Sequence, residues 1–158
     1  GINAEYGDKM QDPDPNKVYY IRSKMQPNKQ LEIQIGAIDI IDADLVLYNI
    51  TCQLNQCFRF ELIQPEVPGE KKYNIINVQS NMYLVEEFNV EGNKIVQKPS
   101  PSTQWQVTKG NDGYYQFRIF DVPLFMDLSE ENIQNGAIVI SWPGHGRDNQ
   151  KWQLVVDM

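Results

Sequence analysis

Apolar and polar residues alternate along short stretches of this chain, and no stretch longer than a turn or two has the 3.6-residue repeat of an amphipathic helix. Alternation with a period of two indicates half-buried β-strands. Three such stretches place a tyrosine two residues before an apolar residue, at residues 19–23, 73–77 and 115–119. Turn-forming residues separate the stretches, as at residues 111–113 and 135–136. We therefore predict an all-β protein built from short strands.

An internal repeat organises these strands. Three segments begin with an aromatic residue and continue with polar–apolar alternation, and their aromatic residues are Phe58, Trp105 and Trp152. Both intervals, 105 − 58 and 152 − 105, are 47 residues. Another strand-like stretch precedes each aromatic residue, at residues 45–48, 95–97 and 138–142. Because no single repeat can bury its apolar face alone, the three repeats must share one core.

The residues around these aromatics carry a family resemblance. The segments Gln56-Cys57-Phe58, Thr103-Gln104-Trp105 and Gln150-Lys151-Trp152 follow a Gln-x-Trp signature once per repeat, with departures in the first two. Together with residues 73–80 and 148–152, this signature resembles the ricin-B-like lectin family, especially its small single-domain fungal members. The resemblance covers roughly residues 18–156.

This resemblance implies a β-trefoil, in which three pseudo-symmetric repeats surround one core. We expect an N-terminal extension at residues 1–17 and a single domain at residues 18–158. The repeats are expected at about residues 18–64, 73–109 and 114–156. In the family the signature aromatic belongs to the core, so Phe58, Trp105 and Trp152 are expected to be structural.

The third repeat carries the complete set of residues from which the family builds a sugar site. A carboxylate and an amide bind sugar hydroxyls, and an aromatic ring packs against the apolar face of the sugar. The resemblance assigns Asp127 as acceptor of two hydroxyls, Trp142 as the stacking ring and Asn149 as a hydroxyl partner. Gln150 is expected to orient Asp127, and His145 to overhang the same site. The alternative is a turn aspartate, a surface tryptophan and an idle loop histidine.

The first repeat carries a partial set. Tyr48 fills the aromatic position, and Asn55 and Gln56 match the amide pair. Glu32, one methylene longer than aspartate, fills the carboxylate position. Three acids of the following loop could substitute for it, although an acidic loop is often only solvated; they are Asp39, Asp42 and Asp44.

The second repeat lacks the set. Its carboxylate and aromatic positions fall on Val85 and Lys98, and Thr103 replaces the glutamine. Glu86 and Glu87 lie nearby, but we expect them to be solvent-facing charges on a surface strand. We therefore predict no sugar site in this repeat.

Charge excludes one class of partner. The chain has 14 basic and 21 acidic side chains, a net charge of −7 and a pI near 4.7. Nucleic-acid binders need a basic patch, so nucleic acid is not expected as a partner. No apolar run approaches the roughly 20 residues of a membrane helix, so membrane insertion is not expected. Residues 1–17 lack the apolar core of a signal peptide, which favours a cytoplasmic or non-classically secreted protein.

Catalytic and metal-binding motifs are also missing. No Cys/His set has zinc spacing, and no nucleophile elbow or phosphate-binding glycine loop occurs, so we expect neither cofactor nor metal. Cys57 and His145 form a conceivable catalytic dyad, but Cys57 lies inside a strand motif and nothing nearby indicates an activated thiolate. The chain is therefore not expected to be an enzyme.

The resemblance implies a lectin for galactose or N-acetylgalactosamine, which would bind glycoproteins or glycolipids. By analogy alone we expect a homodimer and a defensive role in a fungus. Two alternatives stay open. A β-trefoil protease inhibitor would present a rigid loop, at residues 38–44 or 63–72, to a protease cleft. A structural or signalling trefoil would bind protein.

Overall fold

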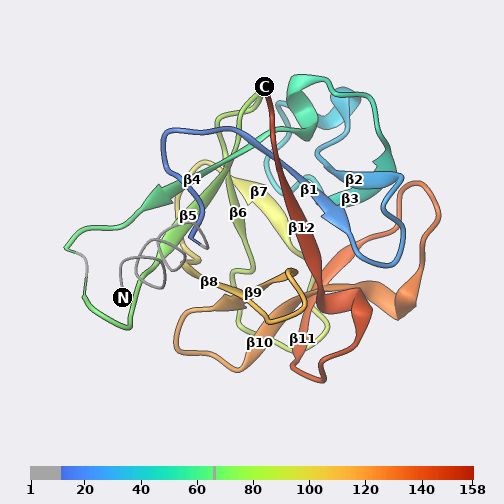
Figure 1. Cartoon of the computed structure of the whole chain (residues 1–158). Coiled ribbons are helices and arrows are strands. Elements are labelled where there is room, and N and C mark those ends of the chain that lie inside the picture. The colour runs from blue at the N-terminus through green and yellow to red at the C-terminus, as the bar shows by residue number, and fades with distance from the viewer. Residues whose placement is uncertain (1–11, 66) are drawn as a thin grey trace.

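Twelve β-strands in three groups of four make up the described part of the chain, residues 12–65 and 67–158 of a computed structural model (Figure 1). The first repeat contains β1 (Tyr19–Ser23), β2 (Lys29–Glu32), β3 (Val46–Asn49) and β4 (Phe58–Leu62). The second contains β5 (Tyr73–Asn77), β6 (Tyr83–Val85), β7 (Val96–Lys98) and β8 (Trp105–Lys109). The third contains β9 (Tyr115–Ile119), β10 (Leu124–Leu128), β11 (Val139–Pro143) and β12 (Trp152–Val156). Helical structure among the described residues consists of the 3-10 turns η1 (Ile35–Ala37), η2 (Leu54–Gln56), η3 (Ser129–Glu131) and η4 (Asp148–Gln150).

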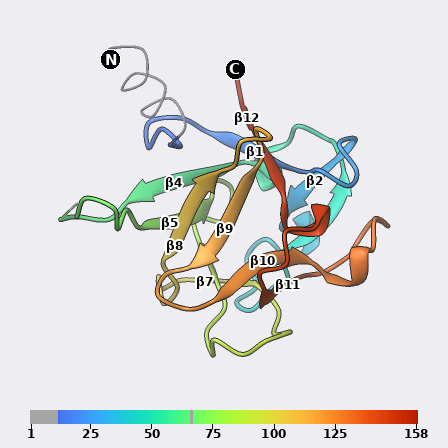
Figure 2. The ribbon, with the colours of Figure 1, turned by 60° about the horizontal axis from the view of Figure 1, so that its bottom comes forward.

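The first and last strands of each repeat close a barrel. Antiparallel pairing runs from β1 through β4, β5, β8, β9 and β12 and returns to β1. The two middle strands of each repeat form a hairpin, β2–β3, β6–β7 or β10–β11. Figure 2 shows β10 and β11 side by side, as in Figure 1. This is the β-trefoil that the sequence predicted.

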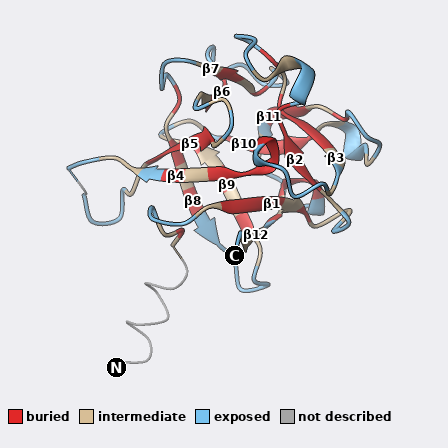
Figure 3. Cartoon of the chain, turned by 90° about the horizontal axis from the view of Figure 1, so that it is seen from above, coloured by how far each residue is buried: buried red, intermediate tan, exposed pale blue. Residues whose placement is uncertain are grey.

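Aromatic side chains fill the core. Each signature aromatic is the ladder partner of the first-strand tyrosine of its own repeat; the pairs are Tyr19 with Phe58, Tyr73 with Trp105, and Tyr115 with Trp152. The three signature side chains are 0% exposed, which confirms their structural role. Both indole N–H groups are satisfied, because Trp105 donates to the Leu84 carbonyl (3.0 Å) and Trp152 to the Met126 carbonyl (3.3 Å). Figure 3 shows the buried residues concentrated in the strands.

A cycle of backbone hydrogen bonds joins the three hairpins. The N–H of Leu45 donates to the Ile95 carbonyl (3.0 Å), Ile95 to Val139 (2.9 Å) and Val139 back to Leu45 (3.3 Å). The repeats are therefore joined where the second strand of each hairpin begins. As a result, the last strand of each hairpin borders a loop from the preceding repeat. For β11 that loop belongs to the second repeat, because the Gly92 N–H donates to the Ser141 carbonyl (2.7 Å).

Part of the expected N-terminal extension contacts the domain. Lys71 forms an ion pair with Asp12 (2.7 Å), and the backbone N–H of Asp14 donates to the Tyr19 hydroxyl (2.7 Å). Residues 1–11 of the expected extension lie outside the described residues. The boundary at residue 17 stays a prediction.

The core packing predicts a large difference between two tryptophans. Trp152→Ala empties a fully buried site and should lower the free energy of unfolding by about 3–5 kcal/mol in a urea titration. Trp142 is 39% exposed, so Trp142→Ala should cost no more than about 1 kcal/mol. Equal losses for the two variants would contradict this account of the core.

Candidate functional site

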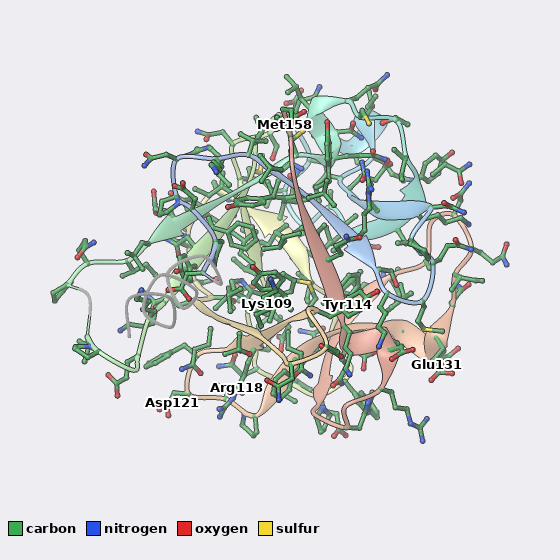
Figure 4. All side chains as sticks on the ribbon, in the orientation of Figure 1. Lys109, Tyr114, Arg118, Asp121, Glu131 and Met158 are labelled. Atoms are coloured by element: carbon green, nitrogen blue, oxygen red, sulfur yellow. The ribbon has the colours of Figure 1, made fainter. Side chains whose placement is uncertain are left out.

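A hollow of about 660 Å³ opens on the surface of the third repeat. We call it the third-repeat hollow. Residues of β10, β11, η3, η4 and the loop after β11 line it, and they include Asp127, Trp142, His145, Arg147 and Asn149. Glu131, labelled in Figure 4, also lines it and lies toward the outer side of the third repeat. Gly92 of the second repeat completes the lining.

Strand alternation directs the carboxylate and the aromatic ring into the same hollow. In the β10–β11 ladder Asp127 is opposite Ile140, and Ile140 precedes Trp142 by two residues. Directly opposed residues, and residues two apart on one strand, project from the same face of a sheet. Asp127 is 2% exposed and Trp142 39% exposed, so the acid lies deep and the ring lies at the surface.

The turn η4 holds two amides against the Asp127 carboxylate. Asn149 Nδ2 donates to Asp127 Oδ1 (3.1 Å), and Gln150 Nε2 donates to Asp127 Oδ2 (2.9 Å). Gln150 also donates to the Pro143 carbonyl (2.9 Å), which ties η4 to the end of β11. Burial raises the pKa of Asp127, while the hydrogen bond from Gln150 and the neighbouring His145 partly oppose this rise.

The other end of the Asn149 amide has no protein partner. Asn149 is 5% exposed, its Nδ2 also donates to the Leu128 carbonyl (3.2 Å), and its Oδ1 is a buried acceptor without a hydrogen bond. Asn55, at the equivalent position of the first repeat, donates to the Ile33 carbonyl (2.9 Å) and has the same unpaired Oδ1. The same unpaired amide oxygen also occurs at Asn74 and Gln97, so it does not by itself mark a ligand site.

His145 lies against the same carboxylate. Its Nε2 is 3.4 Å from Asp127 Oδ2, and its Nδ1 accepts a hydrogen bond from the Arg147 backbone N–H (3.0 Å). Because Nδ1 is an acceptor here, the neutral imidazole carries its proton on Nε2, which faces Asp127. The histidine is therefore held in the hollow rather than free in its loop.

The first repeat reproduces part of this arrangement. Glu32, 5% exposed, accepts a hydrogen bond from Gln56 Nε2 (2.9 Å), and burial raises its pKa. Glu32 is opposite Val46, two residues before Tyr48, so Glu32 and Tyr48 hold the ladder positions of Asp127 and Trp142. The side chain of Gln30 donates to Gln56 Oε1, a contact that the third repeat does not have.

The second repeat differs from expectation at one residue. Val85 and Lys98 hold the ladder positions of Asp127 and Trp142, and Lys98 is paired with Asp42 and Glu87. The expectation that Glu86 faces solvent is wrong, because Glu86 is 1% exposed. It receives hydrogen bonds from the loop that follows it, whereas strand alternation gives no information beyond the end of β6.

The conceivable Cys57–His145 dyad has no support in the described residues, because Cys57 does not line the hollow. Cys57 is 0% exposed, and burial together with Asp157 raises its pKa to about 11, so its thiol is protonated at neutral pH. Within residues 12–65 and 67–158 no group of three or more His, Cys, Asp or Glu side chains could hold a metal ion. The same residues contain no helix with the length and apolar character needed to cross a membrane.

Some lining residues were not found from the sequence. Gly92 comes from another repeat, and Arg147 and residues 129–131 come from irregular segments. Glu130 and Glu131 both have a φ of 56°, a left-handed conformation that neither residue type signals. Residues 91–93 form a Glu-Gly-Asn triplet that is typical of a turn, but the triplet does not show which repeat the turn contacts.

Three β repeats around one barrel place the molecule among the β-trefoils. The family profile described as ricin-type β-trefoil lectin domain-like matches residues 54–142 and again residues 101–158. The chain belongs to this family. Carbohydrate binding is the general function that membership supports for the chain, and the family is typically non-catalytic. No curated protein matches the chain in sequence.

Similar solved structures agree on the fold. The Rhizoctonia solani agglutinin is 18% identical, with a TM-score of 0.80 over 92% of this chain and 99% of that chain. The ricin B-like lectin of Macrolepiota procera, in complex with lactose, is 15% identical, with a TM-score of 0.75 over 90% of this chain and 97% of that chain. The designed threefold-symmetric protein ThreeFoil is 23% identical, with a TM-score of 0.76 over 89% of this chain and 99% of that chain.

The burial of Asp127 predicts a pH dependence of stability. Its folded pKa is raised above the unfolded value of about 4, so the unfolded state releases the proton first as pH rises. Wild-type protein should therefore lose stability relative to Asp127→Asn as pH rises from the unfolded pKa to the folded pKa. Urea titrations of both proteins across this range measure the difference.

Asp112 provides the matched control. A hydrogen bond from Lys151 lowers the pKa of Asp112, so its carboxylate stabilises the fold once it is ionised. Wild type should gain stability relative to Asp112→Asn as pH rises from the lowered folded pKa of Asp112 to the unfolded value of about 4, and should show no further change above it. Parallel pH profiles for Asp127→Asn and Asp112→Asn would contradict the assigned environments.

Proposed function

We propose that this protein is a non-catalytic lectin that binds galactose or N-acetylgalactosamine residues of glycans in the third-repeat hollow. One observation carries the proposal: the buried carboxylate of Asp127, the amide side chain of Asn149 and the exposed indole of Trp142 line one hollow. These are the three chemical partners that a pyranose needs. The carboxylate and amide match its hydroxyls, and the indole matches its apolar face.

The geometry supports a division of roles. Each oxygen of Asp127 accepts one amide hydrogen bond and keeps acceptor capacity for a sugar hydroxyl. Asn149 would be a further hydroxyl partner, and His145 lies over the Asp127 carboxylate at which the hydroxyls would bind. Galactose has an axial 4-hydroxyl, so the C–H groups of one ring face form a continuous apolar patch suited to Trp142.

A structurally similar lectin supports the proposed class of sugar. The Macrolepiota procera structure contains lactose, a disaccharide that ends in galactose. No feature of the described residues favours the protease-inhibitor alternative. A single shallow site should bind a monosaccharide with a Kd on the order of 0.01–1 mM, because little surface is buried and hydroxyls are costly to desolvate.

Removal of the carboxylate and the ring tests the proposal. Wild-type protein should be retained on a galactose resin and eluted by free galactose, whereas Asp127→Ala/Trp142→Ala should pass through. Asp148→Ala is the control, because Asp148 also lies in η4 but pairs with Lys24 (3.2 Å). Its retention should equal that of wild type. No retention of wild type on any sugar of a glycan array would overturn the proposal.

The first repeat is proposed as a second, weaker site. Glu32, Tyr48, Asn55 and Gln56 hold positions equivalent to those of the third repeat, and Asn55 Oδ1 is also unpaired. Its affinity should be lower because the site has no histidine opposite the carboxylate and Gln30 occupies the Gln56 amide oxygen. Sites in separate repeats, or in the two subunits of the homodimer expected by analogy, would raise avidity on a multivalent surface.

Calorimetric titration with galactose distinguishes one site from two. Wild type should bind two equivalents, Asp127→Ala/Trp142→Ala only the weaker one, and addition of Tyr48→Ala to that variant should remove the rest. If wild type binds one equivalent of galactose and Tyr48→Ala does not change this number, the first-repeat site does not exist and only the third-repeat site binds sugar.

A further inference from the structure

A buried acid of the second repeat contacts β11, the strand that carries Trp142 of the third-repeat hollow. Glu86 follows β6 and is 1% exposed, although a charged side chain is rarely buried without full pairing. Its carboxylate accepts five hydrogen bonds. Oε1 accepts from the backbone N–H of Phe88 (2.9 Å), the N–H of Asn89 (3.0 Å) and Asn93 Nδ2 (2.9 Å). Oε2 accepts from the N–H of Val90 (3.0 Å) and the hydroxyl of Ser141 (2.9 Å). The carboxylate thus organises the loop at residues 87–93 and reaches β11.

The same loop is fastened to the strand that carries the exposed indole. Ser141 directly precedes Trp142, and its backbone N–H donates to the Asn93 carbonyl (2.9 Å). The Gly92 N–H donates to the Ser141 carbonyl (2.7 Å). The Ser141 hydroxyl also lies 3.0 Å from the Val90 carbonyl oxygen. Displacement of the loop would therefore disturb the backbone next to Trp142.

Gly92 brings the loop into contact with the indole. Its φ of +83° is in the left-handed region that favours glycine. A Cβ built on it would lie 3.5 Å from Cζ3 of Trp142, which is van der Waals contact. Gly92 also lines the hollow. The loop therefore packs beside the ring and forms one wall of the hollow.

This acid distinguishes the second repeat from the other two. The residues that follow Glu32 and Asp127 in the sequence are Ile33 and Leu128, both 0% exposed and apolar. In those repeats the 3-10 turns η1 and η3 begin one or two residues later. The second repeat has a glutamate at this position and a loop wrapped around its carboxylate. The repeat without a sugar set of its own thus supplies a support for its neighbour.

We propose that Glu86 is a positioning residue for the third-repeat hollow: its buried carboxylate holds the loop at residues 87–93 against Trp142 and so fixes the wall beside a bound sugar. This inference rests on the proposed sugar binding in that hollow. The affinity for sugar then depends on Glu86, a residue of the second repeat that does not line the hollow. Binding sites depend in this way on the groups that hold their contact residues in place.

Glu86→Gln tests the inference with little change in volume. The substitution replaces one carboxylate oxygen by an NH₂ group that faces donors, so at least one of the hydrogen bonds is lost. The galactose Kd should rise about tenfold in protein whose near-ultraviolet circular dichroism shows an intact core. Without sugar, acrylamide should quench tryptophan fluorescence more strongly than in wild type. This signal reports Trp142, because the other two of the three tryptophans, Trp105 and Trp152, are 0% exposed.

Gln97→Leu is the matched control. Gln97 is 0% exposed and its Nε2 donates to the carbonyls of Ile38 and Ile40 (2.9 Å each), so it fastens a first-repeat loop. Leucine suits the site because Leu47 holds the same hydrogen-bonding position in the first repeat. Gln97→Leu should lower Tm but leave the galactose Kd and the quenching of Trp142 unchanged.

The outcomes separate this inference from the function on which it rests. Wild-type quenching and wild-type Kd in folded Glu86→Gln would overturn it, as would equal effects of Gln97→Leu. If wild type binds no galactose, the proposed function fails, and acrylamide quenching still tests whether Glu86 holds the loop against Trp142.

If Glu86→Gln does not fold, Ser141→Ala replaces it, because this variant removes one of the five hydrogen bonds. Ser141→Ala should raise the galactose Kd and the quenching of Trp142, each by less than expected for Glu86→Gln. No change in either quantity would overturn the inference.

Discussion

None of the three repeats of this protein can bury its apolar face alone, and the rest of the structure follows from that constraint. Phe58, Trp105 and Trp152 meet in one core because each belongs to a strand of the shared barrel. The backbone cycle through Leu45, Ile95 and Val139 then links the hairpins around the pseudo-threefold axis. Every hairpin therefore forms in contact with a neighbouring repeat.

Shared support of this kind lets the repeats diverge in chemistry while they keep the fold. The same ladder position holds Asp127 in the third repeat, Glu32 in the first and Val85 in the second. Replacement of the acid by valine leaves the core intact, because the core depends on the signature aromatics and not on this position. The second repeat instead contributes Gly92 to the lining of the third-repeat hollow and Glu86 to the loop behind it.

Much of this architecture could be predicted from the sequence, because strand alternation and the 47-residue interval are properties of the chain itself. The resemblance assigned Asp127 and Trp142 to one site, and the β10–β11 register places them on one face of the hairpin. The burial of Glu86 could not be predicted, because its direction is set by donors in an irregular loop and on another repeat. The lining by Gly92 and by η3 likewise depends on packing between segments that the sequence does not show to be adjacent. The sugar-binding roles stay predictions that rest on resemblance and geometry.

The central claim is that a sugar packs on the one exposed indole of the third repeat. Two-dimensional NMR of the tryptophan side chains resolves the three indole N–H groups, and a galactose titration reports each of them separately. The account predicts a saturable shift of the Trp142 signal, while the signals of Trp105 and Trp152, both donors to core carbonyls, stay nearly fixed. An unchanged Trp142 signal at galactose concentrations that saturate binding would contradict it.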